Sequence, residues 1–121
     1  MDDLQAVRNA VYDYFDVLYR CDLGAFDRVF AETCNLQTVK DGKSVFISRA
    51  EYRAILEERK SPESLGAPRE NEIVLIDQTG AKTAIAKVCA RINAAVYVDY
   101  LSFMNLNGSW RIVGKVYQEI A

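Results

Sequence analysis

Residues 82–117 read KTAIAKVCARI, NAA, VYVDYLSFMNL, NG and SWRIVGKVY: three long runs separated by two short turn segments. In the first run, small and apolar side chains alternate with mixed ones, which predicts a strand with one buried face. Turns of two or three residues force neighbouring strands to run antiparallel. A fourth run at residues 72–78 joins them through Thr79-Gly80-Ala81, so the C-terminal half is predicted to be a meander. One side of the first run carries Ala84, Ala86, Val88, Ala90 and Ile92.

Two helices are predicted at the N-terminus. Apolar residues recur at spacings of three and four between residues 4 and 18, which predicts a helix over about residues 2–20. Asp22 can cap a second, short helix with Phe26 and Phe30 on its inner face. Because the connection is only a residue or two long, the helices must turn sharply against each other.

A hairpin and a third helix are predicted next. Asp41-Gly42 lies between two short runs within residues 35–47, a pattern typical of a two-residue hairpin turn. Ser48-Arg49-Ala50-Glu51 is a capping box that opens a helix, and Ser61-Pro62 ends it. The loop over residues 60–71 holds both prolines.

This order of elements predicts a single α+β domain over residues 1–121. We expect three helices of the N-terminal half to pack on a strongly curved antiparallel sheet, which gives a cone. Small strand residues opposite Tyr14, Phe15 and Leu18 allow either a filled core or a cone with a pocket at its open end. The loop over residues 60–71 is either a lid at that end or a plain connector.

The composition narrows the classes of function. The chain has 121 residues with 15 basic and 17 acidic side chains, a formal charge of -2 and no histidine. The missing histidine excludes Ser-His and Cys-His nucleophile pairs and removes the usual zinc ligand. No basic patch for nucleic acid is expected from this charge, and no apolar run approaches the ~20 residues of a membrane span. We therefore expect neither nucleic acid nor a membrane as a partner.

The cysteines and the N-terminus bear on the compartment. Cys21, Cys34 and Cys89 are odd in number and have no C-x-x-C spacing, so neither a disulfide scaffold nor a metal site is expected. No cofactor is expected either. The first residues are acidic and lack the basic start and apolar centre of a secretory signal, which favours the cytoplasm.

The other side of the strand at residues 82–92 predicts a partner. Ile85 and Cys89 share it with Lys87 and Arg91, a surface too apolar to be simply solvated. It is either the interface of a two-fold homodimer formed through the outer sheet face or an ordinary scatter of surface apolar residues. We expect the homodimer.

The chain resembles the nuclear transport factor 2-like superfamily, a SnoaL-like, cystatin-like α+β cone. Within that superfamily it is similar to the branch called putative lumazine-binding proteins. The resemblance covers almost the whole chain and is specific for the fold rather than for chemistry. The strings that carry it are Val11-Tyr12-Asp13-Tyr14-Phe15, Cys21-Asp22-Leu23, Val29-Phe30, Asp41-Gly42-Lys43, Ser48-Arg49-Ala50-Glu51-Tyr52, Ser61-Pro62, Pro68-Arg69, Val98-Asp99-Tyr100-Leu101-Ser102, Asn107-Gly108-Ser109-Trp110-Arg111-Ile112-Val113 and Lys115-Val116-Tyr117.

The resemblance also suggests where a site would lie. In the ketosteroid isomerase branch, a tyrosine of the first helix and a protonated aspartic acid of a late strand form an oxyanion hole, and Tyr14 and Asp99 fall at those places. That branch also needs a carboxylate base where this chain has Thr38. Many relatives carry His-Pro-Asp-Ala or Asp-Asp-Ala directly after the phenylalanine that corresponds to Phe30, and here Ala31-Glu32-Thr33-Cys34 follows it. These departures favour binding over catalysis.

The leading hypothesis is therefore a non-catalytic domain that binds an unidentified small molecule. The alternatives are a lyase or isomerase in which Tyr14 and Asp99 polarise a carbonyl, and a protein-interaction or dimerisation module. Asp99 faces either the pocket or a basic residue on the outer sheet face, and no catalytic residue is assigned. The run Arg49, Arg53 and Arg59 is expected to form the solvated face of the third helix. The candidate pocket residues are Tyr14, Phe15, Leu18, Phe30, Thr38, Tyr52, Leu56 and Asp99.

Overall fold

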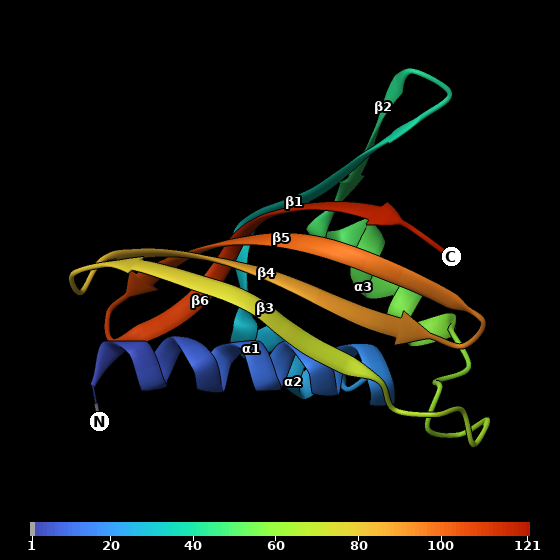
Figure 1. The fold of residues 1–121 in the computed structure, drawn as a ribbon, viewed down its shortest axis with the longest axis horizontal. Helices are drawn as coiled ribbons and strands as arrows, with labels where there is room; N and C mark the ends of the chain where they lie inside the picture. Colours follow the sequence, from blue (N-terminus) through green and yellow to red (C-terminus); the bar gives the residue numbers. More distant parts are fainter. Residues whose placement is uncertain (1) are drawn as a thin grey trace.

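A computed structural model describes residues 2–121, and within that range the chain forms three helices and six strands (Figure 1). The helices are α1 (Asp3–Arg20), α2 (Leu23–Val29) and α3 (Arg49–Glu58). The strands are β1 (Phe30–Lys40), β2 (Lys43–Ser48), β3 (Asn71–Thr79), β4 (Thr83–Ile92), β5 (Ala95–Leu106) and β6 (Ser109–Glu119). No helix in the described range is both long and apolar enough to cross a membrane.

Capping side chains begin the helices where the sequence predicts. The Asp2 carboxylate accepts a hydrogen bond from the Gln5 backbone N–H at 2.7 Å and caps α1. The Asp22 carboxylate does the same for α2 through the Ala25 N–H at 3.0 Å. Both bonds of the predicted capping box form at the start of α3. Phe30, expected in the second helix, instead begins β1, so the chain passes from helix to strand without a loop.

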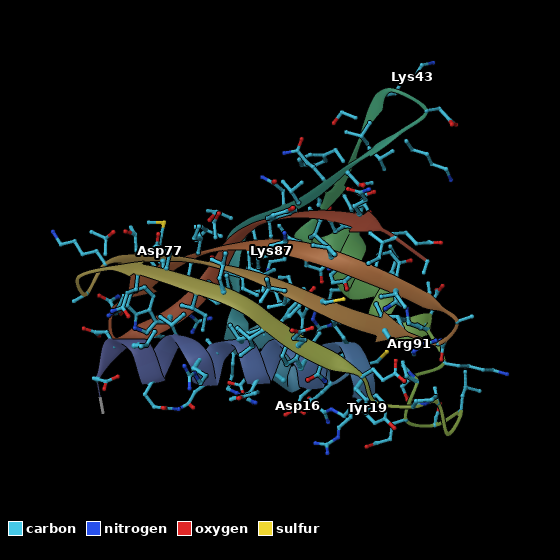
Figure 2. All side chains as sticks on the ribbon, viewed as in Figure 1. Asp16, Tyr19, Lys43, Asp77, Lys87 and Arg91 are labelled. Carbon is cyan, nitrogen blue, oxygen red and sulfur yellow. The ribbon has the colours of Figure 1, made fainter. Side chains whose placement is uncertain are left out.

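The sheet has the strand order β2-β1-β6-β5-β4-β3. All neighbouring strands are antiparallel, as predicted, except β1 and β6, which are parallel. The exception lies where the β1–β2 hairpin joins the meander β3–β6: β1 pairs with β6, the last strand of the meander. Helix α1 runs along one face of the sheet, α3 lies near one end of β5 and β6, and the β1–β2 hairpin projects away from the rest of the chain (Figure 1). Lys43 stands near the tip of that hairpin (Figure 2).

Most of the cone is filled by side chains. Aromatic residues from α1, α2 and α3 meet there, and the rings of Phe26 and Phe30 stack with centroids 4.5 Å apart. Ala84, Ala86 and Ala90 of β4 are buried on the inner side, so the alternation predicted for that strand is confirmed. The sequence left open whether the cone is filled or has a pocket at its open end. Both features are present, because side chains fill the centre and a cavity remains near one end.

A bulge in β6 decides which side chains face inward near that end. Ser102 of β5 pairs with Gly114, but the next residue, Phe103, pairs with Ile112, which leaves Val113 as an extra residue. Side chains beyond the bulge are therefore shifted by one position in the alternation. As a result Lys115 faces the helices instead of the outer side of the sheet, although Ile112 also faces inward.

The loop at residues 60–71 is bonded to the end of α1. The Glu63 N–H donates to the Tyr19 carbonyl at 3.0 Å, and the Tyr19 hydroxyl donates to the Ala67 carbonyl at 2.9 Å. Asp16 and Tyr19 lie on the last turns of α1 beside this loop (Figure 2). These bonds make the loop a fixed connection from α3 to β3.

Candidate functional site

A cavity of about 110 Å³ lies between α3 and the inner side of the sheet near one end of the cone. Its apolar wall comes from four different elements, namely Leu36 of β1, Ile47 of β2, Ile55 of α3 and Ile92 of β4. Its polar wall is formed by Tyr52, Arg59, Tyr97, Asp99, Lys115 and Tyr117. Small-molecule sites combine an apolar wall with convergent polar groups, and this cavity has both, with the polar share unusually large.

A buried ion pair lies in the polar wall. The Asp99 Oδ2 atom accepts a hydrogen bond from the Tyr14 hydroxyl at 2.5 Å and lies 3.8 Å from the Lys115 Nζ atom. The side chains of Asp99 and Lys115 are only 1% and 5% exposed. Tyr14 reaches this oxygen from the middle of α1, whereas the two charged residues are contributed by neighbouring strands, β5 and β6.

The Lys115 ammonium is enclosed by aromatic rings. Its Nζ atom lies 5.2 Å from the ring centre of Tyr14, 5.0 Å from that of Tyr52 and 5.2 Å from that of Tyr117. Aromatic faces attract cations, and the attraction is greatest where water is excluded. The rings thus replace part of the hydration that Lys115 loses on folding.

The pKa values of this cluster are shifted in one direction. Burial lowers the pKa of Lys115, but the nearby Asp99 carboxylate and Tyr52 outweigh that effect and leave the pKa above its ordinary value. Burial raises the pKa of Tyr14 well above 10, and the adjacent Asp99 charge raises it further. Tyr14 therefore remains a hydrogen-bond donor and Lys115 a cation at neutral pH.

These shifts predict that the protein loses stability in alkali. A group with a raised pKa in the folded state stabilises the fold below its unfolded pKa, about 10 for Tyr and Lys, and loses that contribution as the pH rises further. We expect the free energy of unfolding, measured by urea titration, to fall above about pH 10. Tyr14→Phe should reduce the slope of that fall, whereas Tyr12→Phe, at a half-exposed position on the same helix, should leave it unchanged. A free energy that is constant up to pH 11 would contradict the assignment.

Two buried polar atoms of the cavity lack partners. Among the described residues, the Asp99 Oδ1 atom accepts no hydrogen bond and the Arg59 Nη1 atom donates none. Buried polar atoms in folded proteins are nearly always satisfied, by protein groups, water or a ligand. Both residues line this cavity, so a ligand that enters it lies beside one acceptor and one donor that no described protein group satisfies.

Two larger hollows lie on the surface. One, of about 600 Å³, is beside β3 and β4, and both of its arginines are already paired, Arg91 with Glu70 at 2.8 Å and Arg69 with Asp16 at 2.7 Å. The other, of about 730 Å³, runs beside the β1–β2 hairpin and shares Tyr97 and Tyr117 with the 110 Å³ cavity. These two rings meet edge to face with centroids 6.3 Å apart, so they separate an outer hollow from an inner one.

The candidate residues from the sequence fall into three groups. Tyr52 and Asp99 line the cavity, and Tyr14 lies behind Asp99 and holds its carboxylate. Thr38 lines the outer hollow, and its hydroxyl donates to the Tyr117 carbonyl at 2.5 Å. The other four pack in the filled core: Phe15, Leu18, Phe30 and Leu56.

Two residues of the site were not predicted. Arg59 was expected on the solvated face of α3, which is wrong, because the helix ends at Glu58 and Arg59 continues with extended backbone, φ -69° and ψ 135°. Its side chain therefore does not follow the helical face of Arg49 and Arg53, and it lines the cavity. Lys115 was missed because strict alternation from Ile112 places it on the outer side of the sheet. The sequence signal that points to the bulge is Gly114, because a glycine inside a strand often marks one.

The arrangement of the polar groups differs from that of an isomerase. An isomerase-type oxyanion hole requires a neutral aspartic acid that donates to the substrate. Here Asp99 is paired with Lys115 and accepts a hydrogen bond from the Tyr14 hydroxyl, so the one donor of the tyrosine is already in use. Among the described residues that line the cavity, Asp99 is the one carboxylate. No group of three His, Cys, Asp or Glu side chains in the described range could hold a metal ion.

A curved sheet covered by helices, with a site near one end of the cone, defines the nuclear transport factor 2-like class of proteins. A nuclear transport factor 2-like protein of unknown function from Silicibacter pomeroyi is 25% identical, with a TM-score of 0.85 over 97% of this chain and 95% of that chain. A similar protein of unknown function from Shewanella baltica is 19% identical, with a TM-score of 0.83 over 98% and 94%. A ketosteroid isomerase-like protein from Erwinia carotovora atroseptica is 15% identical, with a TM-score of 0.75 over 99% and 98%.

The family within that class follows from the sequence match. The family model described as putative lumazine-binding matches residues 2–118, and the chain belongs to that family. The predicted superfamily and branch are thereby confirmed. No curated protein matches the chain.

Proposed function

We propose that the protein binds a small organic molecule near the open end of the cone without transforming it. The observation that carries this proposal is the buried Asp99 carboxylate, which has one oxygen unpartnered in a cavity that also contains an unpartnered Arg59 nitrogen. The head of the ligand occupies the cavity, and its body passes Tyr97 and Tyr117 into the outer hollow of about 730 Å³.

Binding without catalysis is supported by the state of the polar groups. A general base must be able to take a proton from the substrate. The threonine at the position of the isomerase base is not a carboxylate, and its hydroxyl donates to a backbone carbonyl. The Tyr14 hydroxyl already donates to Asp99, so it has no proton left for a substrate carbonyl. The alternative, a lyase or isomerase, needs Tyr14 free to donate to a substrate carbonyl. If any turnover is found, an unchanged rate in Tyr14→Phe would eliminate that alternative.

The proposal is tested on the purified protein. Native mass spectrometry and a crystal structure should reveal a small molecule in the cavity, either carried from the expression host or added. Lumazine, which the family description names, is one compound to add. Adding the ligand should raise the melting temperature of the wild-type protein and have a smaller effect on Arg59→Met. An empty cavity and no stabilising compound in a broad metabolite screen would refute the proposal.

We also propose a homodimer that forms through the outer sheet face. Ile85, Tyr100 and Val116 are each about half exposed on the outer side of adjacent strands β4, β5 and β6. An exposed apolar group of this kind, which spans three strands, is typical of a protein interface. In sedimentation velocity the wild-type protein should be a dimer, and Tyr100→Glu should be a monomer with unchanged circular dichroism. Leu65→Glu, at an exposed loop position, should remain dimeric, and a monomeric wild-type protein would contradict the proposal.

A cytoplasmic location is proposed as well. Its support is that Cys21, Cys34 and Cys89, which all lie in the described range, are unpaired. Unpaired thiols are typical of a reducing compartment. Burial raises the pKa of the Cys34 thiol to about 11, which makes this residue an inert part of the core.

A further inference from the structure

The two unpartnered atoms of the cavity specify the hydrogen-bonding pattern of its ligand. Tyr14 and Lys115 both face the Oδ2 atom of Asp99, so the remaining oxygen, Oδ1, can only accept a hydrogen bond from a ligand. The Arg59 guanidinium has donors and no acceptor, so its free Nη1 atom can only donate to a ligand. A complementary head must therefore present a donor and an acceptor together.

Charged heads satisfy one of these atoms and conflict with the other. A carboxylate would accept from Arg59 but would place its lone pairs against the Asp99 oxygen. An amidinium or ammonium would donate to Asp99 but would add a positive charge to a wall that already holds Arg59 and Lys115. Leaving a buried polar group unpaired strongly disfavours a ligand, so both charged classes are rejected by the same pair of residues.

We propose that the ligand has a neutral carboxamide or lactam head, whose N–H donates to Asp99 Oδ1 and whose carbonyl accepts from Arg59 Nη1. This inference rests on the proposed function, since it assigns chemistry to the same site. The cavity of about 110 Å³ has room for a head of roughly three or four water-sized groups. The rest of the ligand is flat or apolar, because it lies against the rings of Tyr97 and Tyr117 on its way to the outer hollow.

Three compounds of matched shape test the head directly. 2-Naphthamide, 2-naphthoate and 2-naphthamidine share one aromatic body and differ in whether the head is neutral, anionic or cationic. Dissociation constants are measured by protein-observed NMR titration at neutral pH. The amide should bind the wild-type protein at least about tenfold more tightly than either charged compound, because each charged head leaves one buried group of the wall without its partner.

Substitutions in the wall should change this preference in opposite ways. In Asp99→Asn the Tyr14 hydroxyl retains the side-chain carbonyl, so the amide N–H₂ faces the cavity and the site should now prefer the naphthoate. Arg59→Met removes the donor and should weaken the naphthamide about tenfold. It serves as the second variant if Asp99→Asn fails to fold. Arg53→Met is the matched control, because Arg53 lies on the outside of α3, paired with Asp27 at 2.9 Å, and its loss should leave all three constants unchanged.

The possible results separate this inference from the proposed function. A wild-type preference for the naphthoate or the naphthamidine, or equal binding of all three, overturns the amide head. If none of the three binds but native mass spectrometry finds another retained compound, the head class is wrong and the binding function stands. If none binds and no retained compound is found, both proposals fail.

Discussion

Replacing Lys115 with methionine is expected to lower the free energy of unfolding by about 3 kcal/mol or more at neutral pH. Asp99 is 1% exposed, and Lys115 supplies the positive charge nearest to its buried carboxylate. Removing one member of a buried ion pair leaves the other as an uncompensated charge, which is far more costly than the loss of the pair as a whole. The Tyr14 hydrogen bond alone cannot replace an ammonium that is held among three aromatic rings.

Urea titrations followed by circular dichroism measure this loss. Lys82→Met, at an exposed position in the turn before β4, is the control and should change stability by less than about 0.5 kcal/mol. The double variant Asp99→Asn with Lys115→Met should recover most of the loss, because it removes both charges and retains an oxygen for Tyr14. If Lys115→Met is as stable as its control, Lys115 and Asp99 do not form the buried pair described here.

Replacing Phe30 with alanine is the second large effect, with an expected loss of about 3–5 kcal/mol. Phe30 is completely buried at the point where α2 passes into β1, and its ring contacts those of Phe26, Tyr14 and Tyr52 at centroid distances of 4.5, 5.9 and 5.9 Å. The loss combines the transfer of the ring from water with the cavity left among residues of three helices.

The matched control for this prediction is Phe46→Ala. Phe46 lies on the projecting hairpin and is 57% exposed, so its loss should cost less than about 1 kcal/mol in the same urea titration. Equal effects of the two substitutions would mean that the cone is not filled around Phe30. A Phe30→Ala protein that does not fold at all would agree with the prediction, because the expected loss approaches the total stability of a domain of this size.

Local signals account for most of what the sequence predicts about the fold. Asp2, Asp22 and Ser48 begin helices because their side chains accept the first free backbone N–H groups. Asp41-Gly42 turns the first hairpin with both residues at positive φ, 53° and 75°, as a two-residue turn of this type requires. The parallel pairing of β1 with β6 was not predicted, because it joins segments more than 70 residues apart, such as Leu36 with Lys115. Local signals say nothing about such a pair.

The site was predicted only in part, and the reasons are geometric. The resemblance to the ketosteroid isomerase branch predicted that Tyr14 and Asp99 lie at one site, and in the structure a hydrogen bond joins them. Lys115 was missed because a β-bulge reverses the alternation of β6, and its one mark in the sequence, Gly114 beside Val113, also occurs in strands without a bulge. Arg59 was placed wrongly because helical spacing was extended one residue past the end of α3. In both cases the backbone, rather than the character of the side chain, decides where the charge goes.

The bulge at Val113 determines which charged side chain lies in the interior of the cone. One inserted residue exchanges the inner and outer sides of β6 beyond it, so the strand presents Lys115 and Tyr117 to the interior, and Val116 to the exterior. Without the bulge, strict alternation from Ile112 through the same residues would turn Val116 instead of Lys115 toward Asp99. Loss of the codon for Val113 would leave the ionic interior unchanged, because Ile112, Gly114 and Lys115 would then pair in unbroken alternation with Phe103, Ser102 and Leu101. The sequence of this strand thus tolerates a deletion at the bulge but not a straightening of the backbone around it.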